Sequence, residues 1–408
     1  MDRPCDGGAG FTVRDRRILY ATALLRSLGT SLVGVLLGIY LARLGLDAAT
    51  VGLVVSCGLG GAALAALLVT VGGDRFGRRR ALVGLALAGA AGTAVALATS
   101  RLPVLIPAVV VGMLNGMGRD RGAALVVEQA ILPATAGEER RTLSFAWYSM
   151  LQDIGHSLGA LLAGAPVLLR AWLGIDELGS YRLVLGTNAA LLLATALLYL
   201  SLSPVAEAPA ARRVPLSPGS RRPLFGLAAL FGLDSLAGGF LTSALLAYFF
   251  FERFGVAEST IGLLFFGARV ANAGSHLGAA WLAKRIGLVN TMVFTHIPSS
   301  VLLLTVAYAP SFPVAAVLFL LREGLVEMDV PTRQSYVMAV VRPEERTFAS
   351  GLTNLVRLGG WAVAPAFAGL LMVGGSLGAP LLVGSGMKIA YDLLLFGAFR
   401  RRRPPEER

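Results

Sequence analysis

The chain has 408 residues, of which 55% are hydrophobic and 15% are charged, and its mean hydropathy is +0.71. Soluble globular proteins average roughly 45–50% apolar and about 25% charged residues, so this composition excludes an ordinary soluble domain and predicts an integral membrane protein. The formal charge of +12 does not indicate nucleic-acid binding, because the arginines lie in short clusters between apolar segments.

A membrane-spanning helix needs about 20 mostly apolar residues, and about twelve segments of the chain meet this requirement. We expect a polar cytoplasmic tail at 1–17, which shows no cleaved signal peptide. The predicted spans are 18–43, 48–71, 80–99, 102–131, 142–170, 182–203, 224–252, 258–283, 288–308, 312–341, 346–374 and 376–399.

The segment Pro204–Pro223 contains five prolines and four arginines. We expect it to be a cytoplasmic linker at 204–223 that separates a six-helix bundle at 18–203 from a second six-helix bundle at 224–399. A cytoplasmic tail at 400–408 follows. The predicted fold is therefore all-α, with two six-helix halves.

The arginines predict the orientation. With the N-terminus in the cytoplasm, 23 of the 36 lysines and arginines fall in tails and loops on the cytoplasmic side, and five fall on the other side. By the positive-inside rule both termini are expected in the cytoplasm, and we expect the protein in the plasma membrane.

The two halves also repeat. Gln129, Arg141-Thr142, Gly155 and Gly164 recur 205 residues later as Gln334, Arg346-Thr347, Gly360 and Gly369. A second set, Gly45, Thr50, Gly52 and Gly77, recurs 210 residues later as Gly255, Thr260, Gly262 and Gly287. The pattern predicts pseudo-symmetric halves related by an axis along the membrane normal, as in many transporters.

The loop between the second and third spans contains Asp74-Arg75-Phe76-Gly77-Arg78-Arg79. It resembles the cytoplasmic signature loop of the major facilitator superfamily, although Thr70 stands where a glycine is usual, and a degenerate copy follows at Ala283–Gly287. The resemblance implies a cytoplasmic gate in which Gly77 forms a tight turn, Asp74 meets the start of the eleventh span and Arg78 pairs with Glu128. Arg333 is assigned to the same gate.

Many polar residues lie inside the predicted spans, where charges usually face the bundle interior or water. From their helical spacing we expect a solute cavity lined by Arg26, Asn115, Arg119, Gln152, His156, Arg269, Asn272, Arg322, Asn354, Arg357 and Trp361. The proton-coupling candidates are Asp153, Asp234 and Glu323, because a buried carboxylate can take up a proton near physiological pH.

Some of these residues have an alternative interpretation as permanent ion pairs that never contact solute, such as Arg26 with Asp234 or Asp153 with Arg357. His296 and Lys388 are expected to be structural.

We therefore expect a secondary transporter that moves a small polar or charged organic solute by alternating access, with proton coupling, and the arginines favour an anionic group. A proton-driven multidrug efflux protein is an alternative, although the fifth span reads Gly155-His156-Ser157-Leu158-Gly159-Ala160, without the proline typical of such exporters. A membrane sensor or lipid-handling protein without solute turnover is another. No enzyme motif, metal site or cofactor is expected, and the predicted state is a monomer in the bilayer.

Overall fold

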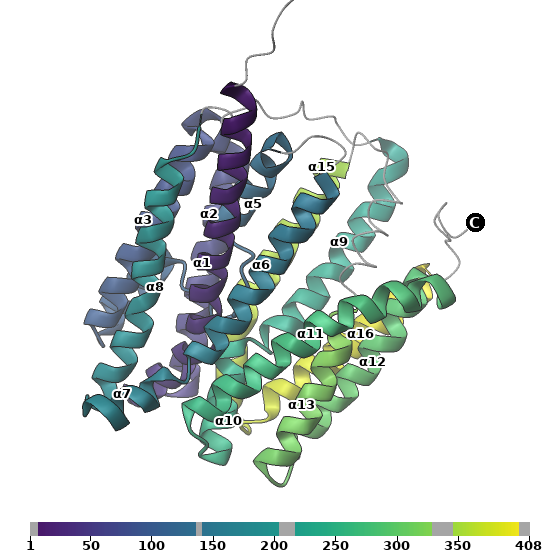
Figure 1. Cartoon of the computed structure of the whole chain (residues 1–408). Coiled ribbons are helices and arrows are strands. Elements are labelled where there is room, and N and C mark those ends of the chain that lie inside the picture. The colour runs from purple at the N-terminus through teal and green to yellow at the C-terminus, as the bar shows by residue number, and fades with distance from the viewer. Residues whose placement is uncertain (1–6, 136–140, 204–216, 329–345, 400–408) are drawn as a thin grey trace, which may run out of the picture.

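The computed structural model describes residues 7–135, 141–203, 217–328 and 346–399, and every regular element in these ranges is a helix (Figure 1). The first half contains α1 (Gly7–Arg43), α2 (Ala48–Phe76), α3 (Arg78–Ala98), α4 (Leu102–Gly112), α5 (Ala123–Ile131), a 3₁₀ turn (Leu132–Thr135), α6 (Arg141–Leu162), α7 (Ala165–Leu173) and α8 (Glu177–Leu200). The second half contains α9 (Pro218–Gly239), α10 (Ser243–Phe254), α11 (Glu258–Ile286), α12 (Leu288–Ala307), α13 (Phe312–Val326), α15 (Arg346–Gly374) and α16 (Ala379–Phe399).

Length and apolarity make this a multi-pass membrane protein. Eight described helical segments are long and apolar enough to cross a membrane, and the pair α6–α7, which bends by 41°, makes a ninth if it is one span. The pair α4–α5 and the helices α11 and α13 occupy the remaining predicted spans. The predicted all-α membrane fold is therefore confirmed.

Several predicted boundaries were wrong. α1 begins at Gly7 rather than at residue 18, and the Asp15 carboxylate accepts hydrogen bonds from Ser203 N (3.1 Å) and Oγ (2.5 Å). Residues 218–223 belong to α9 rather than to the linker. The tenth predicted span leaves the helix after Val326, and its residues 329–341 lie outside the described ranges.

The fourth predicted span, 102–131, is not one helix. α4 ends where Met113 adopts a left-handed conformation (φ 49°, ψ 40°), and Gly118 also has a positive φ of 72°. The Asn115 side chain replaces the missing helical bonds, because its Nδ2 donates to Arg119 O (2.7 Å) and its Oδ1 accepts from Met117 N (2.9 Å). Local bonds of this kind compete with the helix. Asn115, Arg119 and Gly122 therefore do not share the helical face that their spacing predicted.

The seventh predicted span, 224–252, is also interrupted, at residues 240–242. Thr242 has an extended conformation and caps α10, since its Oγ1 accepts a hydrogen bond from Leu245 N (3.4 Å). A threonine at this position satisfies an amide that the helix leaves unpaired. Both halves thus contain a broken span.

The predicted pseudo-symmetry is confirmed by equivalent glycine contacts. Gly155 of α6 packs so closely on α1 that an added methyl group would lie 2.6 Å from Leu24 O and 2.9 Å from Ser27 Cβ. Gly360 of α15 packs in the same way on α9, where an added methyl group would lie 3.1 Å from Gly232 O and 3.0 Å from Ser235 Cβ. These two glycines are a predicted repeat pair.

The halves contact each other most closely at the face that bears the connections 44–47, 99–101, 174–176, 255–257, 309–311 and 375–378, which we call the distal face (bottom of Figure 1). A methyl group added to Gly52 of α2 would lie 2.3 Å from Pro365 O and 3.0 Å from the Gly369 backbone, and one added to Gly262 of α11 would lie 3.1 Å from Gly164 N. Small residues allow such close approach of helices in membranes. The two contacts are equivalent, because Gly52 and Gly262 are one predicted repeat pair and Gly369 and Gly164 are another.

Candidate functional site

The two broken spans meet between the halves. The amide of Ala244, in the first turn of α10, donates to Gly116 O (3.0 Å), and Ser243 Oγ donates to Met117 O (2.9 Å). Backbone outside a helix is tolerated at membrane depth only where it is buried in protein or lines a cavity. Peptide groups freed by the break after α4 are thus paired with the start of α10 in the other half.

A cavity of about 110 Å³ lies beside this contact. Residues 113–122, which connect α4 to α5 and which we call the break segment, line the cavity from the first half. The remaining lining comes from the second half, from α9, α10, α11, α12, α13, α15 and α16. Its charged lining comprises Arg119, Arg121, Arg269, Arg322, Arg357 and Lys388 against Asp234, Glu323 and Glu327. Among the lining residues that the structure describes, basic side chains therefore outnumber acidic ones by six to three.

Several of these charged side chains form ion pairs. Arg119 NH1 lies 2.9 Å from Glu327 Oε2 and joins the two halves. Arg322 pairs with the neighbouring Glu323, and Lys388 Nζ lies 2.8 Å from Asp234 Oδ1. Each cavity carboxylate thus has a basic partner.

Arg269 has a different environment. Its side chain lines the cavity although the residue is only 9% exposed, and its NH2 group donates to Gly118 O (3.0 Å) and Ser243 Oγ (3.4 Å). Its Nε atom is buried without an acceptor, and in the described ranges no carboxylate lies within ion-pair distance of the guanidinium. A buried donor without an acceptor costs about 1–3 kcal/mol, and more when charged, so the site leaves a cation with spare hydrogen-bonding capacity facing a cavity.

Trp361 forms an aromatic wall of the same cavity. The guanidinium carbons of Arg121 and Arg357 lie 4.9 Å and 4.7 Å from its ring centroid. Cation–π contacts at such distances contribute about 0.5–2 kcal/mol. The indole ring therefore holds two arginines, one from each half, at the cavity edge.

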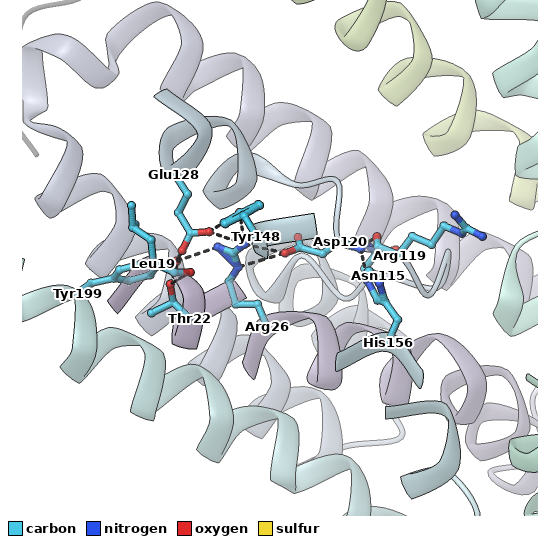
Figure 2. Close-up of polar contacts among 10 residues, drawn as sticks. All are labelled: Leu19, Thr22, Arg26, Asn115, Arg119, Asp120, Glu128, Tyr148, His156 and Tyr199. Atoms are coloured by element: carbon cyan, nitrogen blue, oxygen red, sulfur yellow. Dashed lines mark hydrogen bonds and ion pairs between the residues drawn. The ribbon is translucent and has the colours of Figure 1, made fainter. Parts of the chain in front are cut away.

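A second charged cluster lies inside the first half (Figure 2). Arg26 of α1 lies 2.7 Å from Asp120 in the break segment and 2.9 Å from Glu128 of α5. Glu128 is completely buried and accepts hydrogen bonds from Thr22 (2.5 Å), Tyr148 (2.5 Å) and Tyr199 (2.6 Å). This carboxylate is fully satisfied inside the first half, and the cluster ties the break segment to α1 and α5.

His156 also holds the break segment, because the amide of Asp120 donates to its Nε2 atom (2.9 Å; Figure 2). Arg26, Asn115 and Asp120 line a separate, smaller cavity of about 90 Å³ within the first half. The described residues contain no group of three or more His, Cys, Asp or Glu side chains that could hold a metal ion.

A family model described as Major Facilitator Superfamily matches residues 19–251 and 227–408, so nearly the whole chain is covered by two matches. The chain belongs to the major facilitator superfamily. It is therefore a member of a transporter family, not an enzyme.

This major facilitator resembles several known proteins. It is 25% identical to the uncharacterized membrane protein YJR124C of Saccharomyces cerevisiae over 94% of this chain and 93% of the yeast protein. Among solved structures, the nucleoside transporter NupG has a TM-score of 0.72 at 16% identity and covers 96% of this chain and 100% of its own. The D-xylose-proton symporter has a TM-score of 0.70 at 14% identity, covering 98% and 99%.

The human organic anion transporter MFSD10 (TETRAN) has a TM-score of 0.62 at 18% identity, covering 94% of this chain and 99% of its own. Likenesses at these identities establish the fold alone: two bundles of a major facilitator.

In this major facilitator, seven of the predicted solute and proton residues line the central cavity: Arg119, Asp234, Arg269, Arg322, Glu323, Arg357 and Trp361. Asn272 lies behind the lining and donates to Glu323 Oε2 (2.8 Å). Gln152, Asp153 and Asn354 are not among its described lining residues.

Two predicted ion pairs were wrong. Arg26 binds Asp120 and Glu128 rather than Asp234, because Asp234 lies in the other half beside Lys388. Glu128 pairs with Arg26 rather than with Arg78, whose NH1 atom donates weakly to Ala130 O (3.5 Å). Because Glu128 is buried beside Arg26 inside the first half, these two side chains pair with each other, and neither is left for Asp234 or Arg78.

The gate residues are only partly described. Gly77 has a φ of 84° and forms the expected tight turn between α2 and α3. The side chain of Asp74 and the whole of Arg333 lie outside what the structure describes.

Asp120, which pairs with Arg26, and Asp392, whose carboxylate lies 2.9 Å from His296 Nδ1, were not predicted. Arg121 and Glu327 were not assigned to the cavity that they line, and His296 and Lys388, which were expected to be structural, line it as well. One signal was present, because Lys388 and Asp392 are spaced i, i+4 and share a helix face. Lys388 is also one of only two lysines in the chain.

Proposed function

We propose that this chain is a secondary transporter that moves a small organic anion across the membrane by alternating access, with proton coupling. The observation that carries the proposal is Arg269, a buried guanidinium that faces the cavity with one donor unused and no carboxylate partner in the described ranges. An intramembrane charge is costly unless it is paired or meets water or solute. A carboxylate or phosphate on the solute would supply the counter-charge that Arg269 lacks.

Neighbouring groups support an anionic solute. Ser243 lies at the first turn of α10 and already contacts Arg269 NH2, and half-helix N-termini at membrane depth favour negative charge. Arg322 and Arg357 face the same cavity. Trp361 offers a flat apolar surface, which suits a solute with an organic part. Similarity in fold to a transporter named for organic anions is consistent with this class.

Alternating access is supported by the distribution of contacts between the halves. The close glycine contacts and the pair Arg170–Glu258 (2.9 Å) lie at the distal face. We propose that these contacts separate in the opposite state, while the loop with Asp74, Gly77 and Arg78, together with Glu128 and Arg333, forms or supports the other gate. Both termini are proposed to lie in the cytoplasm, with the protein a monomer in the plasma membrane.

A thermal-shift screen tests the solute class. Purified protein would be heated with a panel of small mono- and dicarboxylates, sugar phosphates, neutral sugars, nucleosides and lipophilic amines. A ligand at a concentration of about 100 times its Kd stabilises the folded protein by about 2.7 kcal/mol. At least one organic anion should therefore raise Tm, and its neutral analogue should not. Arg269→Gln should abolish the shift.

The matched control is Arg43→Gln, which removes an exposed arginine that pairs with Glu177 at the distal face (3.0 Å). This variant should keep the shift. Stabilisation by lipophilic amines alone, or an anion shift that persists in Arg269→Gln, would contradict the proposal.

A further inference from the structure

A chain of four ionisable side chains runs from the cavity into the second half. Asp234 of α9 contacts Lys388 of α16 (Oδ1–Nζ 2.8 Å), and Lys388 Nζ lies 3.3 Å from His296 Nε2 of α12. The other ring nitrogen, Nδ1, lies 2.9 Å from both carboxylate oxygens of Asp392. Three helices thus contribute one continuous hydrogen-bonded row.

Burial differs along this row. Asp234, Lys388 and His296 line the cavity, whereas Asp392 is 0% exposed and has His296 as its polar partner. Tyr391 covers the imidazole edge-on, with ring centroids 6.1 Å apart. Asp392 is therefore the closed end of the row, and Asp234 is the end of the row that lies at the cavity.

The distances define the hydrogen-bond roles. With a neutral imidazole that carries its hydrogen on Nδ1, His296 donates to Asp392 and accepts from the Lys388 ammonium, which also donates to Asp234. Every contact is then satisfied, but two carboxylates and one ammonium leave the row with a net charge of −1. One added proton makes it neutral, which favours uptake in a buried site.

We propose that Asp234, Lys388, His296 and Asp392 form a proton relay that takes up one proton from the cavity and stores it on the His296–Asp392 pair. The proton enters at Asp234. Lys388 passes one of its own protons to His296 Nε2 as Nδ1–H moves to Asp392, and the resulting Lys388 amine then takes the proton from Asp234. No bond other than those to hydrogen changes, and the charge of the row rises by one. Chains of acidic residues and histidine inside membranes are typical of such relays.

The surrounding charges explain how the relay would act on the solute, an inference that rests on the proposed function. Besides the relay, the described charged groups that face the cavity are Arg119 and Arg121 from the first half, Arg269 of α11, Arg322 and Glu323 of α13, Glu327 directly after α13, and Arg357 of α15. A proton on the relay adds positive charge beside these groups. It should therefore strengthen binding of an anion, and by linkage the anion strengthens proton binding. This mutual effect favours co-transport of proton and anion in one direction.

Infrared titration of the purified protein tests the relay without any solute. Difference spectra between about pH 5 and about pH 8 should contain the carbonyl band of one protonated carboxylic acid. Asp392→Asn should remove this band. His296→Gln and Lys388→Met interrupt the row and should shift its pH midpoint by more than one unit.

Ser385→Ala is the matched control, because Ser385 is buried on the same helix as Lys388 and its hydroxyl makes no hydrogen bond. It should leave the band unchanged. A band that persists in Asp392→Asn overturns the relay. If Asp392→Asn does not fold, the relay is overturned when neither His296→Gln nor Lys388→Met moves the midpoint.

The spectrum does not depend on flux, so the failure of the relay and the failure of the transport proposal are distinguishable. If the wild type carries an anion, Asp392→Asn should still equilibrate it down its own gradient but should lose acceleration by a pH gradient. Unchanged acceleration in that variant would also overturn the relay.

Discussion

Arg26 and Arg269 are both buried arginines, but they differ in their partners. Arg26 has two carboxylates within 2.9 Å, and Tyr199 accepts a further hydrogen bond from it (2.8 Å). Arg269 has two neutral acceptors and one unused donor. At the residue scale, the charge of the first arginine is compensated within its own half, and we propose that the charge of the second is compensated by the solute.

Removing Arg26 should therefore affect stability. Arg26→Met leaves Glu128 and Asp120 without their shared cation, and breaking a buried pair in this way costs about 3–5 kcal/mol. Thermal or denaturant unfolding in detergent measures the loss. The double variant Arg26→Met/Glu128→Gln should recover part of it, because the amide needs no counter-charge. Stability close to wild type in Arg26→Met would show that the cluster contributes little.

At the scale of elements, glycine contacts hold the distal face closed. Gly52 lies against Pro365 O and Gly369, and Ser56, one turn further along α2, accepts a hydrogen bond from Ala366 N (2.8 Å) beside the proline. Because Pro365 interrupts the helical bonds of α15, the neighbouring peptide groups are available to α2. The two halves are thus joined by backbone contacts that tolerate no added side chain.

A valine at position 52 should open this face. Its Cβ would lie 2.3 Å from Pro365 O. Overpacking of this kind costs about 1–3 kcal/mol in the closed state. A free-energy difference of that size changes the ratio of the open to the closed state about five- to 150-fold. Spin labels at Trp172 and Tyr308, exposed by 80% and 72%, would report the distance between the halves after Cys5 and Cys57 are replaced by serine. The label distance should increase in Gly52→Val.

Gly60→Val on the same helix is the control, because an added methyl group there meets nothing within 4 Å. It should leave the label distance unchanged. Equal distances in Gly52→Val and wild type would mean that these glycines do not hold the closed face.

The sequence predicted the spans better than their interruptions. Apolar length is a local property, so α3 and α12 begin and end close to the predicted residues and α2 begins at the predicted residue. The break after Gly112 depends on Asn115 bonding to its own loop and on Gly116 O accepting from Ala244, 128 positions further along the chain. The helical periodicity of the sequence cannot predict a contact between residues so far apart in the chain. For the same reason the cavity arginines were predicted individually, whereas the partners of Arg26 and Asp234 were not.

At the scale of the whole molecule, the repeat has diverged in charge. Ser27 and Ser235 contact the equivalent glycines Gly155 and Gly360, so the preceding residues, Arg26 and Asp234, occupy equivalent positions. In the first half Arg26 belongs to a satisfied cluster, and in the second half Asp234 opens onto the cavity and Lys388. The second half therefore provides most of the lining of the larger cavity and the whole of the proposed proton relay.

The central claim is that this major facilitator carries a small organic anion through the cavity beside Arg269. The most direct measurement is uptake by proteoliposomes from the same solute panel, with wild type, Arg269→Gln and Arg43→Gln in parallel and with or without a pH gradient. The account predicts saturable uptake of at least one organic anion, accelerated by the pH gradient, retained in Arg43→Gln and lost in Arg269→Gln. Uptake of neutral or lipophilic cationic compounds alone, binding without flux, or equal anion uptake in Arg269→Gln would contradict it.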